Sequence, residues 1–218
     1  LAKKWEIEQD GKRYIFHLRD SVFFNNGKQF ECSDVKFSFE RILDPKVNSH
    51  RKWLFKHVKG ASDFSIGKLN SVNGFSCLDS NIFVIDLYQA FTPFLGLLAM
   101  PSASIINLSQ DGQISGTGPW QVIKWIHDGY IQFARNDNYF ISPPKLEKLK
   151  IRILPESLPK TAEFITGYLD IMEIPESEFS LWSQDSSWSK QIQQQNDLNI
   201  YYLGLNCSRP PFDNKKVR

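Results

Sequence analysis

The sequence predicts an α+β or mixed α/β fold, and three observations lead to this prediction. Hydrophobic residues make up 41% of the 218 residues and aromatic residues 14%, which is enough for a sizeable core. The dipeptides Asp10-Gly11 and Asp128-Gly129 each lie between stretches of alternating apolar and polar residues, a pattern typical of β-hairpins. Strand and helix patterns are mixed along the chain without a strict βαβ repeat.

The first half of the chain is expected to form a hairpin, a helix and a second pair of strands. The hairpin runs from Trp5 to Leu18 around its Asp-Gly turn. Ser33 is suited to cap a helix that ends near Asp44-Pro45, because its apolar residues recur on one face. Residues 75–77 and 82–88 are predicted strands, and residues from about 93 to 99 a short apolar helix that stops at Pro101.

The segment 107–118 is rich in Ser, Gly, Gln and Asn, and it is the predicted main internal boundary. Beyond it we expect a second hairpin from Trp120 to Ala134. The remaining expected elements are a strand at 148–154, a helix from Pro159 to about Ile165 capped by Gly167, a strand at 169–174, a helix at 176–191 and a strand at 199–206.

The charge balance argues against a nucleic-acid partner. Lys and Arg number 26 against 24 Asp and Glu, a net charge of +2, and the basic residues are scattered along the chain. The longest apolar run, Phe94 to Met100, is far short of the roughly 20 residues that a membrane-spanning helix needs, so no membrane span is expected.

The sequence shows none of the usual catalytic or metal-binding patterns. The glycines near Lys68 lack the spacing of a phosphate-binding loop, and the four histidines lack the spacing of metal ligands. We therefore expect no catalytic residue, no metal and no cofactor. Trp5, Trp120 and Trp125 lie in strand patterns, which favours core packing over a ligand site. Cys32, Cys77 and Cys207 are too few for a disulfide scaffold and leave the cellular compartment open.

The order of several short motifs resembles the family 5 extracellular solute-binding proteins, which are the oligopeptide-, dipeptide- and nickel-binding components of ABC importers. The motifs in the first half are Trp5, Asp10-Gly11, the strand 14–19 that ends in Leu-Arg, Phe24-Asn25-Asn26-Gly27, and the segment 33–41 with Asp-Val-Lys-Phe-Ser. In the second half they are Gly116-Thr117-Gly118-Pro119-Trp120, Arg135-Asn136, Tyr139, Gly167, Asp170-Ile171, Leu205-Asn206, and Pro210 to Asp213.

The resemblance implies a partial type II fold of the periplasmic-binding-protein kind. Residues 1–112 would form the lower subdomain of lobe I, residues 113–200 the main sheet segment of lobe I, and residues 201–218 the crossover into the second lobe. The motifs resemble less than half of a family member, so we expect the chain to be cut from a longer one.

The resemblance also implies a function, which is to capture di- or oligopeptides for import. The implied partners are the peptide ligand and the membrane subunits of an ABC permease, and the implied location is periplasmic or extracellular, with a lipid anchor upstream as an option. The expected ligand contacts lie at the margin between the lobes: Ala99, Met100, Pro101, Ser102, Thr117 and Trp120. The absence of an arginine near residues 96–101 favours peptides over nickel chelates.

Two alternatives from other classes remain open at this point. The same fold occurs as the sensing domain of some transcriptional regulators, and unpaired cysteines would suit such a cytoplasmic protein. A peptide hydrolase is the second alternative, but it would need a nucleophile, base or metal that the sequence does not show.

Overall fold

The computed structural model describes residues 1–195 and 202–218. These residues divide into two compact units, Leu1–Ile153 and Leu154–Arg218. The division after residue 153 does not coincide with the predicted boundary after residue 112. The assignment of 1–112, 113–200 and 201–218 to parts of a two-lobed protein stays a prediction.

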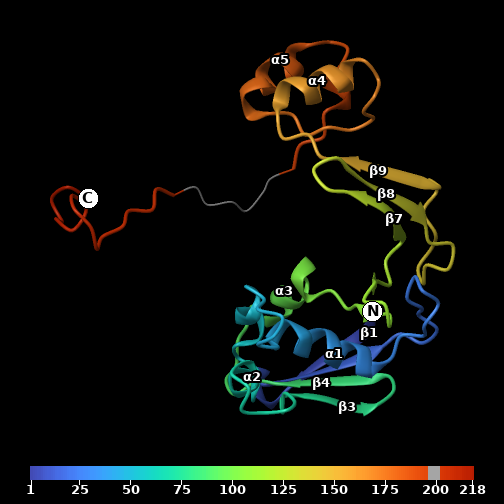
Figure 1. The fold of residues 1–218 in the computed structure, drawn as a ribbon, viewed down its shortest axis with the longest axis vertical. Helices are drawn as coiled ribbons and strands as arrows, with labels where there is room; N and C mark the ends of the chain where they lie inside the picture. The colour runs from blue at the N-terminus through green and yellow to red at the C-terminus, as the bar shows by residue number, and fades with distance from the viewer. Residues whose placement is uncertain (196–201) are drawn as a thin grey trace. The chain divides into compact units, whose positions relative to one another are not determined.

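The first unit begins with a four-stranded antiparallel sheet in the order β1-β2-β4-β3 (Figure 1). The strands are β1 (Ala2–Glu8), β2 (Arg13–Leu18), β3 (Phe75–Asp79) and β4 (Ile82–Asp86). The predicted hairpin around Asp10-Gly11 is confirmed: a short 3-10 helix, Gln9–Gly11, connects β1 to β2, and Gly11 has a φ of 83°. Glycine adopts this left-handed conformation without a steric penalty, which explains the turn.

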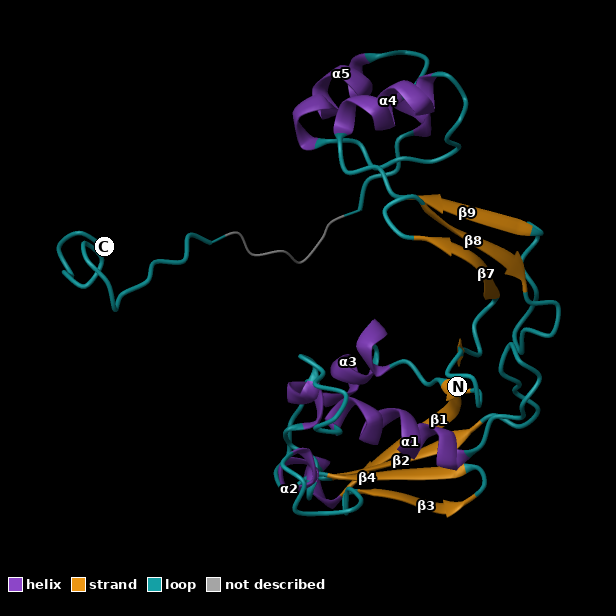
Figure 2. Cartoon of the chain, viewed as in Figure 1, coloured by secondary structure: helices purple, strands orange, loops and turns teal. Residues whose placement is uncertain are grey.

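Helix α1 (Cys32–Leu43) packs on this sheet through its apolar face (Figure 2). The predicted cap was wrong, because Glu31 rather than Ser33 is the N-cap residue. The Asp34 carboxylate accepts the backbone N–H of Glu31 at 2.9 Å, and the backbone N–H of Asp34 donates to the Glu31 carbonyl at 3.0 Å, while Ser33 lies within the first turn. The predicted end of the helix at Asp44 is confirmed.

Aromatic side chains form the centre of the core between α1 and the sheet. The rings of Phe39, Phe55, Phe75 and Phe83 lie with centroids 4.7 to 5.9 Å apart. Smaller elements surround this core, namely α2 (Ala61–Ser65), α3 (Phe94–Leu98) and the 3-10 helices Lys52–Phe55 and Pro101–Ala103. All buried members of the main hydrophobic cluster lie between Tyr14 and Ala103.

A disulfide between Cys32 and Cys77 joins the start of α1 to β3. The expectation of unpaired cysteines is therefore wrong for two of the three, and only Cys207 is free among the described residues. The two cysteines are 45 residues apart in the sequence, and they come together only when α1 packs against β3 in the folded chain. The sequence alone therefore does not show the pairing.

Two further sheets complete the first unit. One is the short pair β5 (Asn107–Leu108) and β6 (Ile114–Ser115). The other has three antiparallel strands in sequence order, β7 (Trp120–Ile126), β8 (Tyr130–Arg135) and β9 (Lys148–Arg152), which confirms the second hairpin and the strand after it.

The tryptophans of these hairpins do not pack in the core, contrary to prediction. Trp5 is 55% exposed, Trp125 is 66% exposed and Trp120 is half-buried. Trp5 lies on the edge strand β1, while Trp125 lies on the outer strand β7. Edge positions lack the second neighbouring strand that shields a central residue.

The second unit is mainly helical. It contains α4 (Ser157–Ile165), α5 (Phe179–Gln184) and the 3-10 helices Glu176–Glu178 and Ser189–Gln191. Phe164, Trp182 and Trp188 pack together with ring centroids 5.2 to 5.7 Å apart. Gly167 follows α4 with a φ of 79°, which confirms the predicted end of that helix.

Three predictions for this unit differ from the structure. Residues 169–174 form no strand, because no described segment of the unit pairs with them. The single helix expected at 176–191 is three short helices interrupted at residues 185–188. The strand expected at 199–206 lies partly outside the described residues, and its described part, 202–206, is irregular.

Candidate functional site

A cavity of about 520 Å³ in the first unit is the candidate site. Residues of β2, α1 and β4 form one part of its wall. Two later segments, residues 103–106 and 116–118, form another part. Its wall is almost wholly apolar and carries no charged side chain: Leu1, Ala2, Phe16, Leu18, Val35, Phe39, Phe83, Ile85, Leu98, Ala103, Ser104, Ile105, Ile106, Ile114, Gly116, Thr117 and Gly118. Such a wall suits a neutral or apolar group.

Of the predicted contact residues, only Thr117 lines this cavity. Ala99 and Pro101 are exposed, whereas Met100 and Ser102 are half-buried beside the cavity-lining residue Ala103. Trp120 is half-buried at the start of β7, three residues after Thr117. The fold thus brings the stretches 98–106 and 114–118 together, although most of the predicted side chains lie just outside the cavity wall.

The segment Gly116–Trp120, here called the strap, is held by two asparagines. Asn25 donates its backbone N–H to the Gly116 carbonyl at 2.8 Å and its side-chain Nδ2 to the Trp120 carbonyl at 3.1 Å. Asn136 donates its backbone N–H to the Pro119 carbonyl at 2.9 Å and its Nδ2 to the Gly118 carbonyl at 3.0 Å.

Thr117 in the middle of the strap is different. The residue is only 9% exposed, yet neither its backbone groups nor its hydroxyl has a hydrogen-bond partner among the described residues. The Thr117 hydroxyl is not among the fully buried unpaired atoms, so it is accessible to water or to a ligand. Thr117 therefore offers both a donor and acceptors at the edge of an apolar cavity.

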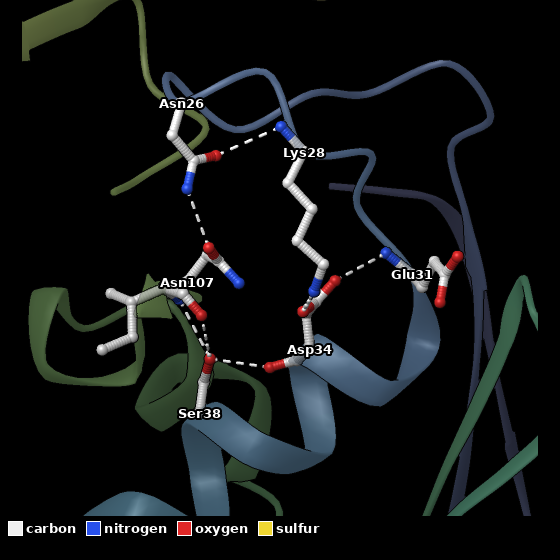
Figure 3. A network of polar contacts seen from close by, with 7 residues as sticks. Asn26, Lys28, Glu31, Asp34, Ser38 and Asn107 are labelled. Carbon is white, nitrogen blue, oxygen red and sulfur yellow. Dashed lines mark hydrogen bonds and ion pairs between the residues drawn. The ribbon is translucent and has the colours of Figure 1, made fainter. Parts of the chain in front are cut away.

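A polar network fixes the wall beside the strap (Figure 3). Lys28 forms an ion pair with the buried carboxylate of Asp34, whose other oxygen accepts the backbone N–H of Glu31 at 2.9 Å. One turn along α1, the hydroxyl of Ser38 donates to the Asp34 carbonyl at 2.7 Å and accepts the backbone N–H of Ile106 at 2.9 Å.

The turn before α1 extends this network to the neighbouring strands. Asn26 donates Nδ2 to the side chain of Asn107 at 2.8 Å, and its backbone N–H donates to the hydroxyl of Ser115 at 3.0 Å. The start of α1, the turn at residues 25–28 and both cavity-lining segments are thus cross-linked by hydrogen bonds.

Sequence reasoning missed the roles of Asn25, Asn26 and Asn136. All three were recognised only as members of the motifs that resemble the family. Asparagine at a turn usually bonds to its own local backbone, so the sequence contains no signal that Asn25 and Asn136 reach the strap from positions 91 to 95 residues before it or 16 to 20 residues after it.

A second cavity, of about 720 Å³, lies in the second unit. Its wall includes the clustered rings of Phe164, Trp182 and Trp188 and the carboxylates of Asp170, Glu173 and Glu176. None of the predicted contact residues lies there. Within residues 1–195 and 202–218, no group of three or more His, Cys, Asp or Glu side chains could hold a metal ion.

The arrangement of strands and helices is that of periplasmic binding proteins. The chain superposes on OppA of Burkholderia pseudomallei with a TM-score of 0.86 over 99% of its length and 45% of that chain, at 23% identity. It also matches DppA of Helicobacter pylori, whose structure contains a peptide, with a TM-score of 0.70 at 27% identity over 85% of this chain and 40% of that one. This confirms the predicted fold.

The chain belongs to the bacterial extracellular solute-binding proteins, family 5, whose middle-region profile matches residues 1–218. It is 31% identical to heme-binding protein A of Haemophilus influenzae, and 28% identical to the dipeptide-binding protein of Escherichia coli. Both alignments cover 100% of this chain but only 43% and 44% of the relatives, so the chain spans less than half of their length. The resemblance seen in the sequence motifs is confirmed.

Proposed function

We propose that this chain is part of the substrate-binding component of an ABC importer and that it contributes to the capture of di- or oligopeptides. The observation that carries the proposal is the family match over residues 1–218. Relatives named as dipeptide-binding and di/tripeptide-binding proteins align with the whole chain, which supports peptides as the ligand class.

The geometry at the strap supports the same ligand class. A peptide bound in extended form needs backbone donors and acceptors on the protein, together with spaces for its side chains. Thr117 supplies unpaired backbone groups and a hydroxyl, and the apolar cavity next to it has room for a hydrophobic side chain. Ala99, Met100, Pro101, Ser102 and Trp120 remain proposed contacts, placed beside rather than in the cavity wall.

The proposed location is the periplasm or the extracellular side of the membrane. The family consists of extracellular solute-binding proteins, and the Cys32–Cys77 disulfide is the kind of bond that persists in an oxidising compartment. No helix within the described parts of the chain is long and apolar enough to cross a membrane. The proposed partners are the peptide and the membrane subunits of a permease, with an upstream lipid anchor as a further part of the proposal.

The names of two relatives suggest other ligands that should be tested beside peptides. One relative is named heme-binding protein A and another nickel-binding periplasmic protein. The cavity wall has neither histidine nor cysteine nor a carboxylate, which favours a peptide over a metal complex at this position. The reported relatives and structures do not favour the regulator or the hydrolase.

The test is calorimetric titration of the full-length protein with a mixed library of di- to pentapeptides, with heme and nickel–histidine as separate titrants. We expect saturable peptide binding in the micromolar range or tighter. Thr117→Val preserves the side-chain shape but removes the hydroxyl, and it should weaken binding severalfold, since one neutral hydrogen bond contributes about 1 kcal/mol. Binding of heme or nickel–histidine without peptide binding would overturn the proposal.

Residues 1–218 alone should bind peptide far more weakly than the full-length protein. A partial site makes only some of the contacts while the cost of immobilising a flexible peptide remains. We expect no saturable binding tighter than about 100 μM, which corresponds to roughly 5.5 kcal/mol. Tighter binding by this chain would show that the complete site lies within it.

A further inference from the structure

We infer that Asn25 and Asn136 form a clamp that positions Thr117 for ligand binding. The inference deepens the proposed function and rests on it, because Thr117 is a proposed ligand contact. Neither asparagine is among the contacts expected from the sequence. Each would act through the strap rather than by touching the ligand.

The clamp accounts for every strap carbonyl except one. Four backbone carbonyls, those of Gly116, Gly118, Pro119 and Trp120, accept hydrogen bonds from the two asparagines. Each asparagine uses the same two donors, its backbone N–H and its side-chain Nδ2. The carbonyl that is left without a partner is that of Thr117, the strap residue at the centre.

The two asparagines come from opposite directions along the sequence. Asn25 belongs to the turn before α1, and Asn136 directly follows β8. The strap links the cavity wall to β7, so it is held at both ends by parts of the chain that are themselves well packed or paired. This arrangement removes the freedom of the strap to rotate, and it thereby sets the direction of the unpaired groups of Thr117.

The side-chain amide of Asn25 is oriented so that its Nδ2 donor, rather than its Oδ1 acceptor, faces the strap. With Nδ2 on the Trp120 carbonyl, the Oδ1 atom is buried without a hydrogen-bond partner. A flipped amide would set Oδ1 against that carbonyl, where two acceptors repel each other. An unpaired buried acceptor is costly, so the bond to the strap determines the orientation.

Asn136 has a satisfied side chain by comparison. Its Oδ1 accepts the backbone N–H of Asn138 at 3.0 Å, which fixes the direction of Nδ2 toward Gly118. Asn25 therefore leaves one buried acceptor unpaired and Asn136 does not, but both residues hold the strap in the same way. Holding a binding segment in its bound geometry before the ligand arrives reduces the ordering cost of binding.

The test uses Asn25→Asp and Asn136→Asp in the full-length protein. Each substitution keeps the size of the side chain and the backbone N–H bond, and replaces the Nδ2 donor by a carboxylate oxygen that repels the strap carbonyl. We expect each variant to bind peptide roughly tenfold more weakly. We expect the double variant to lose less than the product of the two single losses, because both residues act on one segment.

Asn81→Asp is the matched control. Asn81 donates Nδ2 to the Asp20 carboxylate at 2.7 Å in the turn between β3 and β4, and in the described structure it makes no hydrogen bond to the strap. This substitution also exchanges an amide for a carboxylate and weakens a local bond, so it should lower thermal stability while leaving peptide affinity within about twofold of the original protein. The inference is wrong if the clamp variants likewise lower stability but leave the affinity within twofold.

Hydrogen exchange in the ligand-free protein tests the clamp independently of whether the proposed ligand is right. We expect Asn25→Asp and Asn136→Asp to increase deuterium uptake at residues 116–120 while α1 and β4 keep their protection. If no peptide binds the original protein but the strap loosens in both variants, the proposed ligand is wrong and the clamp stands. Unchanged uptake at residues 116–120 would overturn the clamp itself.

Discussion

The two Asp-Gly hairpins of the first unit have the same sequence signal and very different surroundings. In the first hairpin, β2 is a central strand under α1, and Tyr14 and Leu18 are each 3% exposed. In the second hairpin, Val122 is 55% and Trp125 66% exposed on β7. Alternating apolar residues therefore specify a strand but not its burial, which depends on whether another layer covers the sheet.

The second sheet is nevertheless two-sided. Cross-strand pairing aligns Val122 with Phe133 and Leu149, and Trp125 with Ile131 and Ile151, on one face. On the other face the ammonium groups of Lys124 and Lys150 lie 5.9 and 4.3 Å from the ring centre of Tyr130. Within the first unit, cover by α1 rather than the strand pattern distinguishes the two hairpins.

The largest expected difference between the two regions is in core packing. Phe55→Ala removes a fully buried ring from the aromatic cluster and should lower the free energy of unfolding by about 4 kcal/mol. Trp125→Ala should change it by no more than about 0.5 kcal/mol, because the side chain is largely exposed. Urea unfolding of both variants measures the difference, and similar values for the two would break the comparison.

The disulfide stabilises only the first region. Replacing Cys32 and Cys77 together by Ser should lower the free energy of unfolding by about 3 kcal/mol, because the bond closes a loop with a sequence separation of 45. Cys207→Ser is the control, since Cys207 is free and exposed. A reducing agent should act like the double substitution, and equal unfolding midpoints with and without it would contradict this prediction.

The turn of the first hairpin should show a smaller effect. Gly11→Ala should cost about 1 kcal/mol, because the φ of 83° disfavours any residue with a Cβ atom. The new Cβ would meet Ala90 only at an ordinary contact distance of 3.4 Å, so the cost arises from the backbone. Gly96→Ala in α3 is the control: its Cβ would meet nothing within 4 Å, and thermal unfolding should be unchanged or slightly improved.

His57 should make the first region sensitive to mild acid. Its ring is 7% exposed, stacks on Phe91 with centroids 4.3 Å apart, and has a buried Nε2 without a partner. Burial, helped by the charge of Lys56, lowers the pKa of His57 below its ordinary value.

The sign of the effect follows from this lowered pKa. In the unfolded chain His57 takes up a proton near pH 6.5, whereas in the folded chain it does so only at lower pH. The contribution of neutral His57 to the free energy of unfolding is therefore fully present above about pH 6.5, and it decreases as the pH drops toward the folded pKa. The free energy of unfolding, measured from pH 7.5 to 5, should fall less steeply for His57→Gln. Parallel slopes for the two proteins would show that His57 does not contribute.

Much of the first unit was predictable because its signals are local. Both hairpins, the end of α1 at Asp44 and strand β9 follow from turn residues, proline and alternation that act over a few positions. Several of the predictions that failed involve partners distant in sequence. They include the strand at 169–174, the burial of Trp5 and Trp125, and the pairing of Cys32 with Cys77. Two local predictions also failed, namely Ser33 as the cap of α1 and a single helix at 176–191.

The amino-acid sequence by itself determined the fold class and the family, because ordered short motifs and turn residues survive without knowledge of any contact. Only the tertiary structure decided which of the expected contact residues lies at the cavity. Of these residues only Thr117 lines the cavity. Asn25 and Asn136 hold its segment in place by hydrogen bonds from distant positions in the sequence. Hydrogen bonds between remote segments have no periodicity in the sequence, and so the candidate site is recognisable only in the folded chain.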